Sequence, residues 1–187
     1  MNKAFTKESD FDPGLEVSIR PRNVLPAGVK NYITPAGARR LRRELTALVE
    51  VERPRLATEL SRRVEAGRQE EAEHRADQHR LHELDEQIRW LSERVAGLEV
   101  IDPAQHAGNQ VRFGATVTVI DPDGAERVYT IVGVDEADPA EGRISWVSPL
   151  AKALLSAREG DEVVARLPRT DAVLEIDRID YPRATNG

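Results

Sequence analysis

The chain contains no cysteine, and only 4% of its 187 residues are aromatic. Without cysteine, neither a disulfide framework nor a thiolate metal site can form. So few aromatic residues argue against one large core and fit a coiled coil joined to a small β-rich unit. No apolar run is long enough to span a bilayer, and residues 1–30 lack the apolar segment of a signal peptide. We therefore expect a cytoplasmic protein with no membrane contact.

The chain also lacks the excess of positive charge that many nucleic-acid-binding proteins carry. Charged residues make up 32% of the chain, but the formal net charge is -6. Unspecific binding to duplex nucleic acid rewards a basic surface. The charge balance therefore argues against that class of protein, and we expect no specific binding of DNA.

Two long stretches of the sequence do carry helical periodicity. In the second stretch the apolar spacing alternates between three and four, which is typical of a coiled-coil seam: Leu81, Leu84, Ile88, Leu91, Val95 and Leu98. The first stretch has its own apolar face: Leu41, Leu45, Leu48, Leu56, Leu60 and Val64. A polar segment at 67–73 separates them. We expect a monomer in which the helices fold back as an antiparallel hairpin; pairing of the first helix with a second chain is the alternative.

Local signals set the ends of these helices. Thr34 is a good N-cap, Pro35 suits the first helical position, and Gly67 is a natural C-terminal stop. The first helix should therefore run to about residue 66. Pro54 lies inside it and should kink it, although two helices meeting at Arg53 would explain the same pattern. The second helix is expected over residues 70–99.

The sequence changes character after the second helix. We expect a leader at 1–31, the hairpin at 32–101, a linker at 102–109, an α+β domain at 110–182 and a tail at 183–187. The strands of this domain are expected at 116–120, 128–134, 144–147, 162–167 and 173–179, with a tight turn at 121–124. A short helix is expected between Ser148, as its N-cap, and Gly160.

Carboxylates gather where the hairpin should turn. Glu70, Glu71 and Glu73 would lie at the tip of the rod, far from the rest of the chain. The simplest interpretation is a solvated helix N-terminus, where the helix dipole favours acids. Histidines follow, and His79 and His82 have the spacing of some metal-binding pairs. The sequence offers no obvious third ligand for zinc.

Several short motifs, in this order and spacing, resemble the bacterial Gre transcript-cleavage factors, and the GreB-like members more than the GreA-like ones. No single motif is decisive, but together they cover about residues 31–181. They are Asn31-Tyr32-Ile33-Thr34-Pro35, Glu52-Arg53-Pro54, Arg80-Leu81, Phe113-Gly114-Ala115, Val132-Gly133, Ser148-Pro149-Leu150-Ala151, Ala153-Leu154-Leu155 and Gly160-Asp161.

This resemblance implies a function. Gre factors bind RNA polymerase, dock an FKBP-like C-terminal domain at the rim of its secondary channel, and insert the coiled coil into that channel. Carboxylates at the tip then help to hold a Mg²⁺ ion at the polymerase active site, where backtracked RNA is cut. Mg²⁺ commonly takes one or two carboxylates beside substrate phosphates. The chain would thus be an accessory factor that needs no cofactor of its own and shares the Mg²⁺ of the polymerase.

The tip departs from the family pattern, which places an Asp after the glycine and then Ser, Glu and Asn. Counted back from Arg80-Leu81, Glu70 matches the family's catalytic Glu and Glu73 a later acid. The Asp has no counterpart, since Arg68 follows Gly67 directly. We therefore expect a Gre-type regulator or inhibitor that stimulates cleavage poorly, with Glu70 as the residue able to contact the Mg²⁺. If Glu71 or Glu73 replaces the missing ligand, the chain is a cleavage-competent factor instead.

The resemblance also implies two binding surfaces. One is the docking surface for polymerase, at Ser148, Pro149 and Leu150, whose other explanation is the start of a short helix. The other is a basic face of the first helix that would contact the channel or the 3′ end of nascent RNA: Arg53, Arg55, Arg62 and Arg63. A solvated face balanced by nearby glutamates explains the same arginines.

An FKBP-like fold raises one enzymatic alternative, peptidyl-prolyl isomerisation. Such pockets are lined with aromatic residues, and the C-terminal domain has few, spread along the sequence. Fold alone does not confer that activity.

Overall fold

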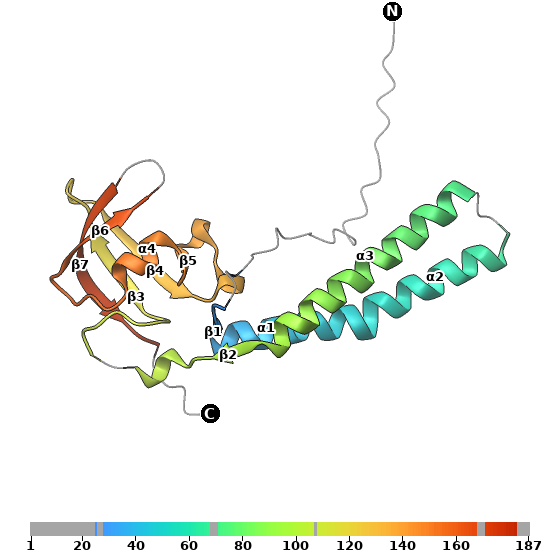
Figure 1. Cartoon of the computed structure of the whole chain (residues 1–187), viewed down its shortest axis with the longest axis horizontal. Coiled ribbons are helices and arrows are strands. Elements are labelled where there is room, and N and C mark those ends of the chain that lie inside the picture. The colour runs from blue at the N-terminus through green and yellow to red at the C-terminus, as the bar shows by residue number, and fades with distance from the viewer. Residues whose placement is uncertain (1–24, 26–27, 68–70, 107, 168–170, 183–187) are drawn as a thin grey trace, which may run out of the picture.

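The computed structural model describes residues 25, 28–67, 71–106, 108–167 and 171–182. A long helical hairpin extends from a compact β-sheet domain, and a small two-stranded sheet lies between them (Figure 1). This is the α+β arrangement that the sequence predicts. No helix among the described residues is long and apolar enough to cross a membrane.

The first arm of the hairpin begins where the sequence places it. The side chain of Thr34 accepts a hydrogen bond from the backbone N–H of Gly37, 3.1 Å away, and Pro35 opens the helix. Helix α1 (Pro35–Ala47) leads into a π-helical turn, η1 (Leu48–Glu52), and then into α2 (Arg53–Glu65). Gly67, with a φ of 60°, follows the C-cap of α2 as predicted.

The π-helical turn explains how the arm accommodates Pro54. A proline inside a helix lacks a backbone donor and crowds the preceding turn. Here the N–H of Arg53 bonds to the carbonyl of Leu48 five residues back, and Arg53 keeps helical dihedral angles. The helical path therefore continues through the proline, and the irregularity is a wider turn just before it rather than a junction of two separate helices.

The second arm, α3 (Glu71–Ala96), is shorter than predicted. The expected helix to residue 99 is wrong, because Leu98–Val100 forms strand β2, which pairs in parallel with β1 (Asn31–Ile33). The N–H of Ile101 adds a hydrogen bond to the carbonyl of Ile33 at 2.9 Å. This pairing ties the entry and exit of the hairpin together.

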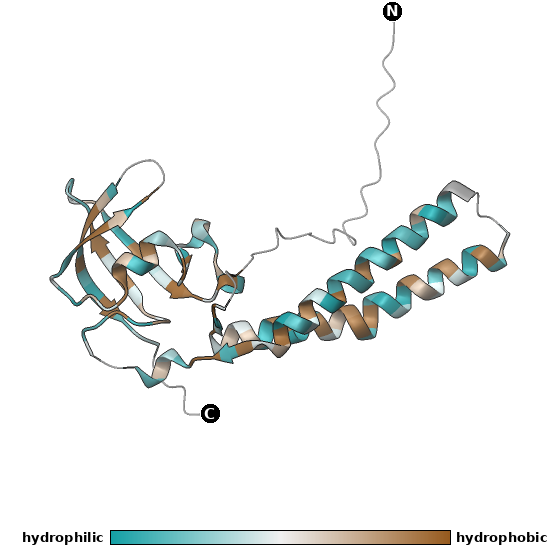
Figure 2. Cartoon of the chain, viewed as in Figure 1, coloured by the Kyte–Doolittle hydropathy of each residue, from teal (hydrophilic) through white to brown (hydrophobic). Residues whose placement is uncertain are grey.

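The hairpin core is confined to the end nearest the sheet domain. Its buried members are Ile33, Ala38, Leu41, Leu48, Leu84 and Leu91. None of the residues of α2 is buried, and Val64, which we expected on the apolar face, is 54% exposed. Apolar and polar residues alternate along both arms in Figure 2, yet only the half near the domain forms a dry core.

The C-terminal domain is a five-stranded sheet of order β5-β4-β3-β7-β6, in which only the β4–β5 pair is parallel. The strands are β3 (Thr116–Ile120), β4 (Glu126–Val132), β5 (Arg143–Ser145), β6 (Glu162–Arg166) and β7 (Asp171–Asp180). Helix α4 (Pro149–Leu154) packs against one face. The buried core combines sheet residues with Ala151 and Leu154 of α4.

Two expectations for this domain are corrected. Strand β4 ends at Val132, and Val134–Glu136 is a short 3-10 turn, η3, rather than the end of a strand. Helix α4 ends at Leu154, well before Gly160, because Ser156 has a φ of 73° that no helix can continue through. Two further 3-10 turns, η2 (Pro103–Gln105) and η4 (Pro139–Glu141), complete the domain.

Candidate functional site

The far end of the hairpin carries the predicted tip acids. Glu70 lies outside the described residues, and Glu71 is the first residue of α3. The side chain of Glu73, in the first turn of α3, is exposed. The structure thus holds this carboxylate at the end of the rod remote from the sheet domain (Figure 1).

The histidines beyond the tip do not form a metal site. His74 lies 2.9 Å from the amide of Gln78, and His79 lies 3.4 Å from Glu83 on the same helix. No group of three histidine, aspartate or glutamate side chains gathers around a common point anywhere in the described part of the chain. The described residues alone therefore build no complete ligand set for zinc or Mg²⁺.

Two of the four predicted basic residues form ion pairs across the hairpin. Arg53 bonds to Asp85 of α3 at 2.6 Å, and Arg63 lies 3.3 Å from Asp77 of α3. Arg63 also pairs with Glu59 at 2.5 Å. The hydrogen bond from Arg53 lowers the pKa of Asp85 below its ordinary value, and the same bond raises the pKa of Arg53. These two arginines hold the arms together.

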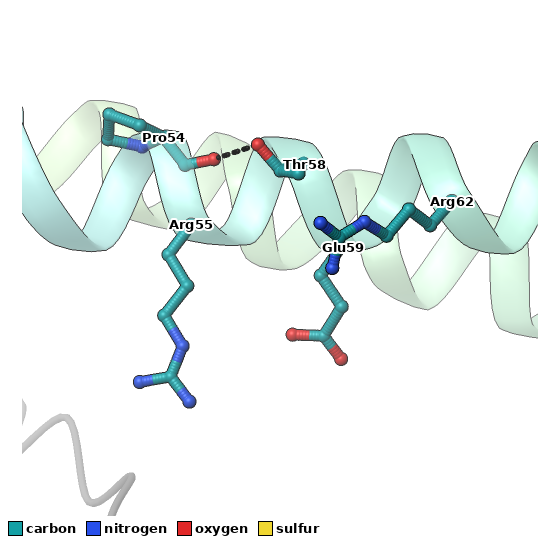
Figure 3. A pocket seen from close by; sticks show the side chains of 5 residues that line it. All are labelled: Pro54, Arg55, Thr58, Glu59 and Arg62. Atoms are coloured by element: carbon teal, nitrogen blue, oxygen red, sulfur yellow. Dashed lines mark hydrogen bonds between the residues drawn. The ribbon is translucent and has the colours of Figure 1, made fainter.

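The other two arginines face solvent. Arg55 and Arg62 line a shallow open groove on α2 together with Pro54, Thr58 and Glu59, and Figure 3 shows Arg55 pointing away from the helix. Neither has a hydrogen-bond or ion-pair partner among the described residues. The exposed basic surface of the rod is therefore narrower than the sequence suggests.

The predicted docking residues lie at the start of α4. The side chain of Ser148 accepts a hydrogen bond from the N–H of Ala151 at 3.1 Å, as an N-cap does. Pro149 is exposed, whereas Leu150 is half-buried and packs against the domain core. Of the three, Pro149 is the residue most available to a partner.

The joint between hairpin and domain is a polar centre that sequence reasoning missed. Glu136 of η3 is only 7% exposed. Its carboxylate accepts hydrogen bonds from the backbone N–H of Thr34 at 2.9 Å, from the Thr34 hydroxyl, and from the N–H of Gly133 at 3.1 Å. A Cβ added at Gly37 would meet Glu136 Oε1 at 2.2 Å, so a larger residue fits there only if the Glu136 side chain moves.

The neighbouring residue Asp135 makes the second half of this joint. Both of its carboxylate oxygens lie 2.8 Å from Nε of Arg94, and their side chains are 7% and 11% exposed. Asn31 donates to the same carboxylate at 3.3 Å, and Arg40 donates to the Asp135 carbonyl at 2.5 Å. Donors from β1, α1 and α3 thus converge on one residue of the sheet domain.

Aromatic residues close the joint on its apolar side. Tyr32 of β1 has ring-centroid distances of 4.9 Å to Trp146 and 6.1 Å to Phe113, both in the sheet domain. On the hairpin, the guanidinium of Arg94 lies 5.4 Å from the ring centroid of Trp90. Arg94 therefore contacts both the hairpin and the domain.

Comparisons with known proteins now bear on these features. The family model described as "Transcription elongation factor, N-terminal" matches residues 31–100, and the one described as "Transcription elongation factor, GreA/GreB, C-term" matches residues 105–181. Transcription elongation factor GreB of Neisseria meningitidis serogroup B is 44% identical over 154 residues, which are 81% of this chain and 94% of that protein. The chain belongs to the GreA/GreB family of transcription elongation factors.

Other members of the GreA/GreB family cover the chain equally well. Transcription elongation factor GreA of Nautilia profundicola is 42% identical over 81% of this chain and 95% of its own length. Among solved structures, that of GreA factor homolog 1 of Thermus thermophilus matches 81% of this chain and 99% of that one, at 22% identity and a TM-score of 0.37. The two family models and the identity to GreB confirm the resemblance to Gre factors. The order of elements in the structure itself confirms the predicted α+β class.

Membership of the GreA/GreB family also settles the enzyme question. Gre factors are non-catalytic accessory factors of RNA polymerase, as the sequence predicts for this chain. The helices of the hairpin pair within one chain, and the alternative in which the first helix pairs with a second chain is not needed to cover its core.

Proposed function

We propose that this chain binds bacterial RNA polymerase, inserts its hairpin into the secondary channel, and occupies that channel without efficiently stimulating transcript cleavage. The observation that carries the proposal is the tip sequence: Arg68 directly follows Gly67, where the family pattern has an Asp. The chain therefore lacks one of the two carboxylates that the resemblance assigns to metal binding. Such a factor would act as a regulator or inhibitor.

The shape of the hairpin supports the first part of this proposal. The first arm spans about 45 Å at 1.5 Å per residue. Two ion pairs join the arms, Arg53–Asp85 beside the apolar core and Arg63–Asp77 beyond it. A narrow rod of this kind fits a deep channel. Arg55 and Arg62 remain free on its surface to meet phosphate groups of RNA or acidic residues of the channel.

The acids that remain at the tip supply at most part of a metal site. Glu70 occupies the position of the family's catalytic Glu, and the exposed Glu73 follows three residues later in the sequence. In this role Glu70 would contact the Mg²⁺ of the polymerase and add one ligand. In this proposal the polymerase holds the metal and performs the chemistry.

Docking is assigned to the start of α4. Pro149 is exposed and rigid, and Leu150 keeps the helix packed on the domain core. We expect Pro149→Asp to weaken binding to core RNA polymerase, measured by fluorescence anisotropy, while the thermal unfolding midpoint stays unchanged. Glu126→Gln, at an exposed position of β4, is the control for a change of surface charge elsewhere. Unchanged affinity of Pro149→Asp would remove this site from the proposal.

The main experiment mixes the chain with stalled, backtracked elongation complexes and measures shortening of the RNA. We expect little shortening, and we expect preincubation with the chain to slow cleavage by a GreB added afterwards. Cleavage at the rate of that GreB would favour the alternative in which Glu70 acts with Glu71 or Glu73. No effect in either arm would contradict binding in the channel.

A gain-of-function variant sharpens this experiment. Arg68→Asp supplies a carboxylate next to Gly67 and removes a cation that repels Mg²⁺. We expect it to increase cleavage, and we expect the further change Glu70→Gln to abolish that gain. If Arg68→Asp leaves cleavage unchanged, the missing Asp is not what limits this chain.

A further inference from the structure

The contacts at the joint carry an inference about how the rod is aimed. We propose that Asp135 and Glu136 act as a latch that fixes the direction of the hairpin relative to the sheet domain, and that they thereby position the tip acids. The proposal rests on the proposed function for its consequence in transcription. The latch itself is a property of the free protein.

The two halves of the latch bind different parts of the hairpin. Glu136 binds the N-terminal end of α1, because its carboxylate accepts hydrogen bonds from the backbone N–H and the hydroxyl of Thr34. The carboxylate of Asp135 accepts a hydrogen bond from Arg94, near the end of α3. The backbone carbonyl of Asp135 accepts one from Arg40 of α1. Because both arms are held from one dipeptide, the hairpin is restrained against bending and against rotation about its own axis.

The latch also lies where a small rotation has a large effect. The contacts are at the base of the rod, and the tip is at its far end (Figure 1). The chain passes from the hairpin to the sheet domain only once, through the segment that follows β2, and the short pairing of β2 with β1 lies beside the joint. Without Asp135 and Glu136, the restraints left from the sheet domain would include the aromatic contacts of Tyr32 and the close packing of Gly133 against the backbone of β1.

Burial and charge explain why these contacts are directional. Glu136 is a buried carboxylate whose three hydrogen-bond donors are uncharged: two backbone N–H groups and the Thr34 hydroxyl. A buried, fully bonded carboxylate tolerates little displacement, because each lost donor leaves a desolvated oxygen unpaired. The close approach of Gly37 to Glu136 further limits how far α1 can move relative to the Glu136 side chain.

The test measures the direction of the rod without polymerase. The chain has no cysteine, so Thr46→Cys on α1 and Glu126→Cys on β4, both exposed, give a doubly spin-labelled protein with no background labelling. We expect one narrow distance distribution by pulsed electron paramagnetic resonance. Glu136→Gln and, independently, Gly37→Ala should broaden or shift it. Gly97→Ala, whose added Cβ meets only ordinary contacts, should leave it unchanged.

A narrow, unshifted distribution in both Glu136→Gln and Gly37→Ala would overturn the latch, whatever the chain does to transcription. Circular dichroism of the same samples identifies a variant that has simply unfolded, and the second variant then decides. If the latch variants broaden the distribution, they should still bind polymerase through the sheet domain but compete less well with GreB for the channel. Failure of all variants, including wild type, to bind polymerase would instead contradict the proposed function alone.

Discussion

The half of the hairpin near the sheet domain and the half near the tip are built from different interactions. The near half encloses Leu41, Leu48, Leu84 and Leu91 in a dry core. In the far half α2 buries no side chain, and an ion pair between Arg63 and Asp77 joins the arms. The difference indicates that stability is concentrated at the base. The sequence of the far half is therefore freer to follow the needs of a binding partner.

The largest expected effect is in the base. Leu91 is 1% exposed, so Leu91→Ala should lower the free energy of unfolding by about 2–5 kcal/mol through lost burial and a residual cavity. Leu60→Ala, at a half-buried site on α2, should cost much less. Urea denaturation followed by circular dichroism measures both. If both variants lose the same free energy of unfolding, stability is not concentrated at the base of the hairpin.

A second test concerns the joint at the base. Alanine normally favours a helix over glycine, but a Cβ at Gly37 meets the Glu136 carboxylate at 2.2 Å. We expect Gly37→Ala to destabilise the protein by about 1–3 kcal/mol, as overpacking does. Gly97→Ala is the matched control and should be neutral or slightly stabilising. If Gly37→Ala stabilises the protein instead, α1 and Glu136 can move apart without lowering the free energy of unfolding.

The Arg53–Asp85 ion pair, near the middle of the hairpin, should give a smaller, pH-dependent effect. Because Arg53 lowers the pKa of Asp85 in the folded state, the contribution of Asp85 is fully present above about pH 4, the ordinary value for an unfolded aspartate. It is lost as the pH falls through the lower folded pKa. The difference in urea midpoint between wild type and Asp85→Asn should therefore shrink in acid and in high salt. A difference independent of both would exclude the ion pair as its cause.

The smallest effect is expected at Val64. This residue is 54% exposed, so Val64→Gln should change the free energy of unfolding by no more than about 0.5 kcal/mol. The same substitution at the buried Leu48 should be strongly destabilising. Thermal melts of the two variants compare them directly. Comparable losses would show that the apolar seam extends to the tip after all.

Local signals in the sequence predicted the hairpin well. Thr34, Pro35 and Gly67 mark the ends of the first arm because capping depends on a few adjacent residues. The heptad spacing likewise identified Leu84 and Leu91 as core. What it could not show is that Leu98 leaves the helix, because β2 exists only through its pairing with β1, far away along the chain.

The joint was missed for a related reason. A glutamate such as Glu136 is usually exposed, and nothing near it in sequence reveals that Thr34, about a hundred residues earlier, supplies its donors. The nearest signal was the pair of glycines, Gly37 and Gly133, whose need for glycine is evident only once the two parts meet. The tip acids, by contrast, stay a prediction from the sequence, because their assignment depends on family position rather than on contacts within the chain.

The two tryptophans are placed so that their intrinsic fluorescence can report on two different parts of the molecule. Trp90 belongs to the hairpin, and Trp146 lies against Tyr32 where hairpin and sheet domain meet. A protein that retains one indole at a time would report through its emission whether the rod melts before, or together with, its attachment to the domain. Coincident melting curves would mean that the two regions share a single cooperative unit.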